Sequence, residues 1–207
     1  MLHRNTVEND TLELLINCNN SPFLNQFFLV GGTALALQIG HRKSIDLDFF
    51  STSSFDEELI SKQLESEFNA KIYGLNPNSI SGEIAGVKFD VISHQYPLIQ
   101  DILVKDDIRL ASLKDIAAMK LNAIQNRGSK KDFVDIYYLL QQFSLQEILS
   151  FHEFKYPNRD GIVALKSLVY FNDAELQPDC ELTSPISWGR MKEFLEKEVF
   201  SFSLPEN

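Results

Sequence analysis

The feature that most constrains the fold is a pair of glycines placed directly after a short apolar run. Phe27–Val30 has the composition of a short buried strand, and it ends on Gly31 and Gly32. A helical pattern follows from about Thr33 to Ile39, and Gly40 is well placed as its C-terminal stop. The order strand, glycine turn, helix predicts a protein in which helices pack on a sheet.

The same turn offers an anion site. Two glycines let the backbone approach a phosphate, and the N–H groups of the following helix point at the anion from the positive end of the helix dipole. Thr33 adds a hydroxyl to this turn. The alternative is a tight turn in which Gly31 and Gly32 only let the strand and the helix pack. The turn by itself leaves both interpretations open.

A second strand is expected from Ser44 to Phe50, and it carries two aspartates. Because side chains alternate along a strand, Asp46 and Asp48 project together while their apolar neighbours face the other side. Adjacent carboxylates repel one another and lose hydration unless a cation lies between them. Oxygen ligands at this separation suit Mg²⁺ bridging to triphosphate oxygens. The alternative, a solvated edge strand, is weakened by the apolar flank Phe49-Phe50.

The rest of the first half adds one helix and three strand-like runs. A capping box at Ser54–Glu57 is expected to open the helix. The strand-like runs are Lys71–Tyr73, Glu83–Ala85 and Val87–Ser93. Asp90 lies within the last run as an acid embedded in an apolar strand, and such a residue taken alone is more often structural than catalytic.

From Ser112 onward the pattern is helical. Capping boxes at Ser112–Asp115 and Ser129–Asp132 each open an amphipathic run. Later helices are expected at Leu145–Phe151, Asp160–Phe171 and Trp188–Phe200. We therefore expect an α+β protein of two domains: residues 1–110 with a mixed β-sheet flanked by helices, and residues 111–207 as a mainly helical lobe.

The first helix of the second half carries cations within its apolar stripe. The stripe consists of Leu113, Ile116, Ala117, Lys120, Leu121, Ile124 and Arg127. An unpaired cation on an inward face is costly, and a bound phosphate or carboxylate would offset that cost. The alternative is that the long side chain reaches solvent, which suits Arg127 at the helix end better than Lys120.

The next helix carries two acids away from its apolar stripe. Asp132 and Asp135 share one face, whereas Phe133, Ile136, Tyr137 and Leu140 form the stripe. Asp132 is explained as the acid of its capping box, and Asp135 has no such explanation.

Composition limits where the protein acts and what it binds. No apolar stretch reaches the ~18–20 residues that cross a bilayer, and the N-terminus lacks the apolar region of a signal peptide. Cys18 and Cys180 form no C-x-x-C motif. We expect a cytoplasmic protein with no membrane partner.

The net charge of −10 argues against wholesale wrapping of nucleic acid. A polyanion would have to meet a local basic patch, and the best candidate is the turn with Arg127, Lys130 and Lys131, together with Arg42 and Lys43. The alternative for the two lysines of the turn is that they are simply solvated.

The order of these motifs resembles the DNA polymerase β-like nucleotidyltransferase superfamily and, within it, the AbiEii/AbiGii toxin family of bacterial toxin–antitoxin systems. The likeness covers roughly residues 27–195. The matching stretches are Gly31–Leu37, Arg42, Ser44 and Asp46–Phe50, then Lys120-Leu121, Ala123, Arg127, Lys131-Asp132 and Asp135–Leu139, and finally Leu168–Glu175 and Trp188.

The resemblance implies transfer of a nucleotide from an NTP in two lobes that close over it. In such a site Asp46 and Asp48, with Asp90 as the third carboxylate, hold two Mg²⁺ ions. The NTP phosphates are held by Gly31, Gly32, Thr33, Arg42 and Lys120, and Asp135 with Asp132 completes the site. The proposed catalytic residues are Asp46, Asp48, Lys120 and Asp135.

The toxin-family likeness makes RNA, such as tRNA, the expected acceptor and a cognate antitoxin an expected partner in a toxin–antitoxin or phage-defence system. Two alternatives are open. One is a nucleotidyltransferase that modifies a small molecule such as an antibiotic, and the other is a catalytically silent regulator that binds nucleotide.

Overall fold

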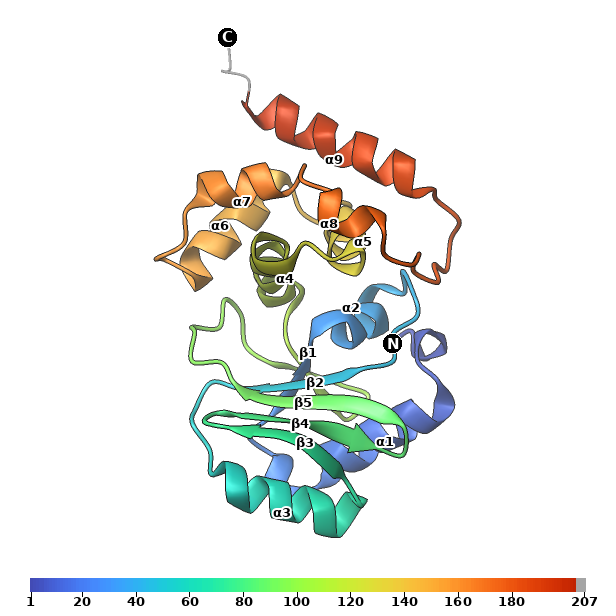
Figure 1. Cartoon of the computed structure of the whole chain (residues 1–207), viewed down its shortest axis with the longest axis vertical. Coiled ribbons are helices and arrows are strands. Elements are labelled where there is room, and N and C mark those ends of the chain that lie inside the picture. Colours follow the sequence, from blue (N-terminus) through green and yellow to red (C-terminus); the bar gives the residue numbers. More distant parts are fainter. Residues whose placement is uncertain (204–207) are drawn as a thin grey trace. The chain divides into compact units, whose positions relative to one another are not determined.

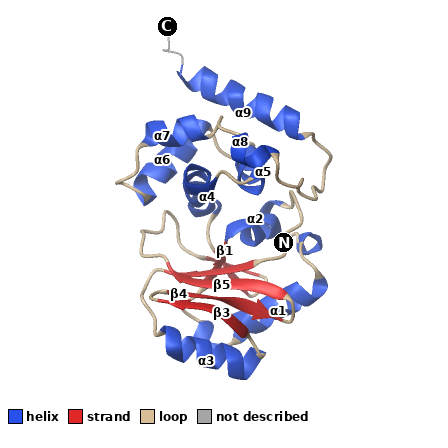
Figure 2. Ribbon diagram, in the orientation of Figure 1, coloured by secondary structure: helices blue, strands red, loops and turns tan. Residues whose placement is uncertain are grey.

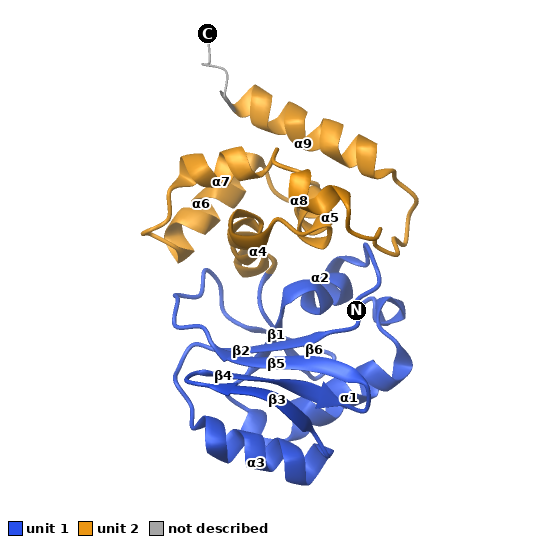
Figure 3. Cartoon of the chain, in the orientation of Figure 1, with its two compact units in different colours: residues 1–112 blue, residues 113–207 orange. Residues whose placement is uncertain are grey.

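The chain forms two compact units, which are coloured separately in Figure 3. The computed structural model describes residues 1–203. The first unit spans Met1–Ser112, and the second begins at Leu113.

Within the described residues, the first unit contains a seven-stranded mixed sheet (Figure 2). The strands are β1 (Phe28–Val30), β2 (Leu47–Ser51), β3 (Lys71–Asn76), β4 (Ser79–Ile84), β5 (Val87–Ser93), β6 (Leu103–Lys105) and β7 (Ile108–Leu110). Their order is β3-β4-β5-β2-β1-β7-β6, and β1, β2, β5, β4 and β3 can be followed in that order in Figure 1. β2 runs antiparallel to β1 and parallel to β5, so it joins the two halves of the sheet.

The two faces of this sheet differ in chemistry because side chains alternate along each strand. One face buries Leu47 and Phe49 of β2. Their neighbours on that face in β4 and β5 are Ile80, Ile84, Phe89 and Val91, all buried. The opposite face carries Asp48 and Asp90, which are only partly buried. The first face belongs to the core, and the second leaves polar groups accessible.

Three α-helices of the first unit pack on different strands of the sheet. They are α1 (Asn9–Asn20), α2 (Gly31–Ile39) and α3 (Glu57–Phe68), and short 3₁₀ turns lie at Arg4–Thr6 and Pro22–Leu24. α1 contacts β7, α2 contacts β1 and β2, and α3 contacts β3 and β4. Gly40 ends α2 in the left-handed conformation, with φ of +71° and its N–H bonded to Ala36, as the sequence predicts.

The two cysteines lie in different units and form no disulfide. Cys18 is buried in α1, and this burial, with a smaller effect from the charge of Glu67, raises the pKa of its thiol to about 12. Cys180 belongs to the second unit and is half-buried.

The described part of the second unit is helical. Its helices are α4 (Leu113–Arg127), α5 (Lys130–Leu139), α6 (Leu145–Lys155), α7 (Gly161–Ser167), α8 (Asn172–Glu175) and α9 (Trp188–Ser203). α4 packs against α5, α6 and α7, and α9 packs against α5 and α6. The rings of Phe133, Phe171 and Trp188 meet edge-on or tilted at centroid distances of 5.1–6.0 Å. No helix within residues 1–203 has the length and hydropathy needed to cross a bilayer.

A fully buried ion pair joins α4 to α6. Lys155 Nζ donates to Asp115 Oδ1 at 2.8 Å, and neither side chain is exposed to solvent. The sequence predicts that Asp115 is a capping acid at the start of α4. Its carboxylate contacts a helix far along the chain, which local sequence could not reveal.

The structure differs from the predicted elements in several places. α1, β6 and β7 were not predicted, and the helix expected at 160–171 ends at Ser167, with the short helix α8 lying beyond that range. The predicted capping box at Ser54–Glu57 is wrong, because α3 begins two residues later with Asp56 as its N-cap, accepting the N–H of Leu59 at 2.9 Å.

The buried pair gives a stability prediction. Lys155→Met should lower the free energy of unfolding by about 3–5 kcal/mol, because it leaves the Asp115 carboxylate buried without its cation. Lys62→Met is the matched control, since Lys62 pairs with Glu58 while both side chains are more than 70% exposed, and it should cost less than about 1 kcal/mol. Denaturant unfolding followed by circular dichroism measures both.

The double variant Lys155→Met/Asp115→Leu should recover much of the lost stability, because it removes the orphaned charge. Equal free energies of unfolding for Lys155→Met and Lys62→Met would show that the buried pair stabilises the fold no more than the exposed pair does.

Candidate functional site

The glycine turn at the start of α2 is shaped by a carboxylate. Gly31 has φ of +69°, a conformation that glycine adopts without strain. A Cβ atom at this position would overlap Oδ2 of Asp48. The absence of a side chain at Gly31 therefore lets the Asp48 carboxylate lie directly against the backbone of the turn.

The second glycine makes room for a cation. A Cβ at Gly32 would overlap a terminal guanidinium nitrogen of Arg42. The Arg42 side chain is buried, and its other terminal nitrogen donates to the carbonyl oxygen of Lys43 at 2.9 Å. The turn is thus bordered by a carboxylate at one glycine and by a guanidinium at the next.

Thr33 is buried and positions the segment that leads into β2. Its hydroxyl donates to the backbone carbonyl of Asp46 and lies 2.9 Å from Oγ of Ser44. The first turn of α2 is therefore tied to the residues just before Asp48. This geometry gives Thr33 a structural contribution, while its contact with phosphate stays a prediction.

Two aspartates are paired in register on β2 and β5. In the parallel pairing of these strands Asp48 is opposite Asp90, so both side chains leave the same face of the sheet, with backbones roughly 5 Å apart. Asp90 accepts a hydrogen bond from the Ser81 hydroxyl of β4 at 2.5 Å. Asp46 is the residue before β2 and is half-buried.

The carboxylates of the first unit can supply part of a magnesium site. Among residues 1–203, no three His, Cys, Asp or Glu side chains form a group that could hold a metal ion by themselves. Mg²⁺ at nucleotide sites commonly takes one or two carboxylates and completes its octahedron with water and substrate phosphates. Asp48 and Asp90, which lie in register, could supply the one or two carboxylate ligands that such a site needs from the protein.

A cavity of about 590 Å³ opens beside Asp46, at the start of β5. It is lined by Glu8, Asn9, Asp10, Thr11, Ile45, Asp46, Ala85, Gly86, Val87 and Lys88. Asp46 is the predicted site residue within it. Ser81, Lys88 and Ser44 were not predicted as neighbours of the site, although the alternation of the Ser79–Ile84 run was a usable signal for Ser81.

The predicted residues of the second unit form a buried ion cluster. Lys120 Nζ lies 3.0 Å from Asp132 Oδ1 and 2.6 Å from Asp135 Oδ2. Both carboxylates are fully buried, and Lys120 is only 4% exposed. The carboxylate partner that the sequence required for Lys120 is therefore supplied from within the chain, and a direct contact of Lys120 with a triphosphate stays a prediction.

Asp132 is the centre of this cluster. Arg127 donates to both of its oxygens, at 2.8 and 3.0 Å, and the Ser129 hydroxyl donates to Oδ2. The predicted capping box at Ser129–Asp132 is wrong, because the Ser129 hydroxyl accepts no backbone N–H and instead donates to the Asp132 carboxylate. Burial raises the pKa of Asp132, but Lys120, Arg127 and Ser129 together outweigh burial and lower it to about 2.

The proposed basic patch is also altered by the structure. Lys130 is buried, and its Nζ donates to the carbonyl of Gln177 at 2.6 Å and to Asp179 at 3.0 Å. The ammonium also lies 5.5 Å from the ring centroid of Trp188. Lys130 is therefore neither a solvated residue nor an exposed contact for RNA, because its charge holds α5 to the segment before α9. Lys131 is exposed.

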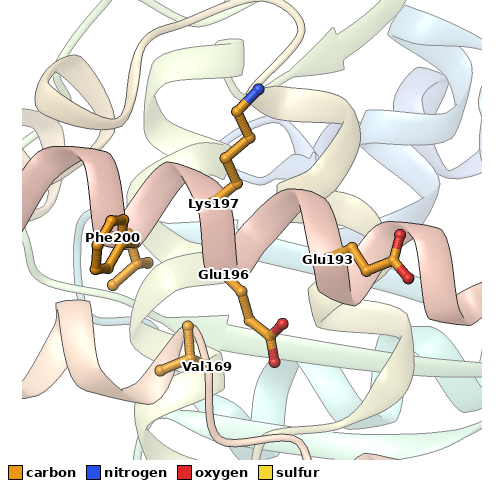
Figure 4. A pocket seen from close by; sticks show the side chains of 6 residues that line it. Val169, Glu193, Glu196, Lys197 and Phe200 are labelled. Carbon is orange, nitrogen blue, oxygen red and sulfur yellow. The ribbon is translucent and has the colours of Figure 1, made fainter.

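A second cavity lies along α9 and holds none of the predicted site residues. Its volume is about 840 Å³, and it is lined by Val169, Glu193, Glu196, Lys197, Val199 and Phe200. Figure 4 shows Glu196 and Lys197 on opposite sides of the helix. We assign this cavity no part in the chemistry.

The fold of this chain is similar to that of solved structures. The solution structure of the antibiotic-resistance factor ANT(2'')-Ia matches with a TM-score of 0.54 and 12% identity, over 70% of this chain and 91% of that one. At this identity the match shows a shared fold. The crystal structure of JHP933 from Helicobacter pylori aligns over 95% of this chain and 97% of its own, with 17% identity and a TM-score of 0.48. The class follows from a family model that matches most of the chain: the protein is a nucleotidyltransferase.

Within this class the chain belongs to the AbiEii family. The family model described as "Nucleotidyl transferase AbiEii toxin, Type IV TA system" matches residues 13–104 and 88–200. The protein aq_aa25 of Aquifex aeolicus (strain VF5) is 38% identical over 183 residues, which cover 84% of this chain and 87% of that protein. The family resemblance seen in the sequence is thereby confirmed.

The glycine turn gives the first prediction for the site. Gly31→Ala should reduce nucleotide transfer about 100-fold, because its Cβ displaces the Asp48 carboxylate. Gly86→Ala is the matched control, since Gly86 also has positive φ, at +85°, but an added Cβ meets nothing within 4 Å. Both variants should lose roughly 1 kcal/mol of stability from the backbone alone. Equal activity losses in a transfer assay would refute the role of the Asp48 contact.

Asp132 gives a prediction for pH. Its pKa is lowered from 3.8 to about 2, so its charge stabilises the fold above pH 4, and this contribution is lost as the pH falls towards 2. The contribution is on the order of 2 kcal/mol. Asp132→Asn should therefore be less stable at neutral pH and lose less stability between pH 4 and pH 2. Parallel acid-unfolding slopes for the two proteins would contradict the assignment.

Proposed function

We propose that this nucleotidyltransferase moves a nucleotide from an NTP to an RNA end, such as that of tRNA, with Mg²⁺ as its cofactor. The observation that carries the proposal is the in-register carboxylate pair Asp48 and Asp90 beside the glycine turn. The family membership supports nucleotide chemistry in general. The RNA acceptor follows from the toxin character of the family and is the finer part of the proposal.

The proposed metal ligands are Asp46, Asp48 and Asp90. Bound Mg²⁺ would neutralise charge on the phosphates and lower the pKa of the attacking hydroxyl. The reaction forms a bond from the acceptor hydroxyl oxygen to the α-phosphorus and breaks the bond to pyrophosphate, which leaves with the electron pair. The hydroxyl proton is released to solvent.

The chain's own residues bind and orient the NTP. We assign Gly31 and Gly32 to the β- and γ-phosphates, because their backbone is open and lies at the N-terminus of α2. Arg42 is assigned to the negative charge of the leaving phosphates, since its guanidinium lies beside Gly32. Thr33 holds the start of β2 in place through Asp46.

The buried ion cluster of the second unit is proposed to act together. Lys120, Asp132 and Asp135 are assigned to the phosphate side of the reaction by the family resemblance. Their mutual contacts support a role in positioning these helices, because Lys120 of α4 pairs with the carboxylates of Asp132 and Asp135 on α5. A buried cation removed from between two buried acids would also destabilise the unit.

The biological setting is proposed from the family description. A type IV toxin–antitoxin family suggests that the protein acts as a toxin with a cognate antitoxin as its genetic partner. We propose that it acts in the cytoplasm, where NTP and RNA are both available. The toxin could act in phage defence as part of the same system.

A small cationic acceptor is the second candidate. The cavity beside Asp46 is lined by the acids Glu8, Asp10 and Asp46 against one cation, Lys88. Such a lining favours an amine-bearing small molecule over a polyanion. An assay that offers the protein labelled NTP together with purified tRNA and an aminoglycoside separates the two candidates, because it measures which acceptor receives the label.

The catalytic assignment predicts the outcome of two substitutions. Asp48→Asn and Asp90→Asn should each abolish transfer while leaving the fold intact or slightly more stable, because each removes a metal ligand and a carboxylate repulsion. Asp107→Asn is the control, since this exposed turn residue has φ of +63°, which Asn tolerates. The assay follows four labelled NTPs into total RNA and total protein, with melting temperatures in parallel. Wild-type turnover in Asp48→Asn would refute the site.

A further inference from the structure

Three aromatic rings gather at one end of the candidate site. Phe50 and His94 are stacked, with centroids 4.8 Å apart and an interplanar angle of 25°. His94 and Tyr96 follow at 4.7 Å and 45°. The rings come from β2 and from the segment that directly follows β5, so two strands that carry the carboxylates also carry the cluster.

The cluster is on the face that bears the carboxylates. Phe50 is two residues beyond Asp48 on β2, so its side chain leaves the same face roughly 7 Å further along the strand. The His94 N–H donates to the carbonyl of Ser51 at 2.7 Å, which keeps the chain beside β2 after β5 ends. The Tyr96 N–H then donates to the carbonyl of His94 at 2.8 Å. Backbone bonds therefore fix where the rings lie.

The glycine turn lies towards the other end of the same strand. β1 is antiparallel to β2 with Val30 opposite Asp48, so Gly31 and Gly32 continue towards Asp46. Phe50 is opposite Phe28 and lies on the far side of Asp48. The order along β2 is glycine turn, carboxylate, aromatic cluster.

The rings remain accessible. Tyr96 keeps 42% of its surface exposed, and Phe50 and His94 are only half-buried. The apolar residues of the opposite sheet face are almost completely buried, so this cluster differs from core packing. A flat aromatic group could add to the stack from the Tyr96 side.

The geometry points to a stacking site for the unpaired base at the end of the acceptor RNA, formed by Phe50, His94 and Tyr96. This inference rests on the proposed function. In phosphoryl transfer the attacking and leaving oxygens lie roughly in line. With the leaving phosphates at the glycine turn, the attacking hydroxyl approaches from the aromatic side of Asp48. Proteins bind single-stranded RNA ends by stacking bases on Tyr, Phe and His, with little dependence on sequence.

The test uses a short RNA whose 3′-terminal base is the fluorescent base 2-aminopurine. Stacking on the wild-type protein should quench its fluorescence. Tyr96→Ala should weaken RNA binding about tenfold, the usual loss for one stacked base, and raise the KM for RNA without raising the KM for NTP. Tyr96→Phe keeps the ring and should restore both. Tyr73→Ala, which removes an exposed tyrosine from β3 of the same sheet, should change neither.

Four results would overturn the inference. One is unchanged quenching and RNA binding in folded Tyr96→Ala and His94→Ala proteins. A second is quenching of 2-aminopurine riboside triphosphate alone, with none of the RNA, which would assign the rings to the base of the NTP. Transfer to RNA without quenching overturns the stacking site and leaves the proposed function intact. Absence of transfer to any RNA overturns the proposed acceptor, and the stacking site with it.

Discussion

The candidate site depends on one close contact, in which the Asp48 carboxylate lies against the backbone of Gly31. This contact requires a residue without a side chain and with a positive φ, and glycine meets both conditions. It also requires that β2 lie between β1 and β5, because β1 leads into the turn and β5 brings Asp90 beside Asp48. A backbone turn and two carboxylates from distant parts of the chain are thereby brought together on one sheet face.

In the second unit, buried acids are paired with buried lysines. Lys120 with Asp132 and Asp135, and Lys155 with Asp115, are buried ion pairs between helices. Burying a charge is costly unless a partner compensates for it, so such pairs mainly exclude other helix arrangements that would leave a charge alone. In the first unit Asp48 and Asp90 instead lie in register on neighbouring strands, and Asp90 accepts a hydrogen bond from the Ser81 hydroxyl. The second unit thus joins acids to cations within its core, whereas the first unit brings two acids onto one partly exposed sheet face.

Sequence patterns predicted the elements that have strong local signals. The glycine turn, α2 with its stop at Gly40, and β5 were recognised because periodicity and glycine placement are local properties. β6 and β7 have three residues each, and neither leads into a glycine turn of the kind that marks the equally short β1. The parallel register of β2 and β5 is a long-range property that no single run of residues contains. Asp132 shows the same limit, because a Ser-x-x-Asp pattern suggested a cap whereas its partner Lys120 lies on the preceding helix.

The unequal burial of the two cysteines has a practical consequence for measurement. Cys18 stays protonated at neutral pH and is enclosed in α1, so it is a poor nucleophile towards thiol reagents. Cys180 is half-buried and borders a cavity of about 300 Å³ that also contains Trp188. A thiol-reactive dye would therefore attach to Cys180 under native conditions, close to Trp188, which can serve as a fluorescence donor. The unaltered sequence thus already provides a spectroscopic label that leaves the carboxylates of the first unit untouched.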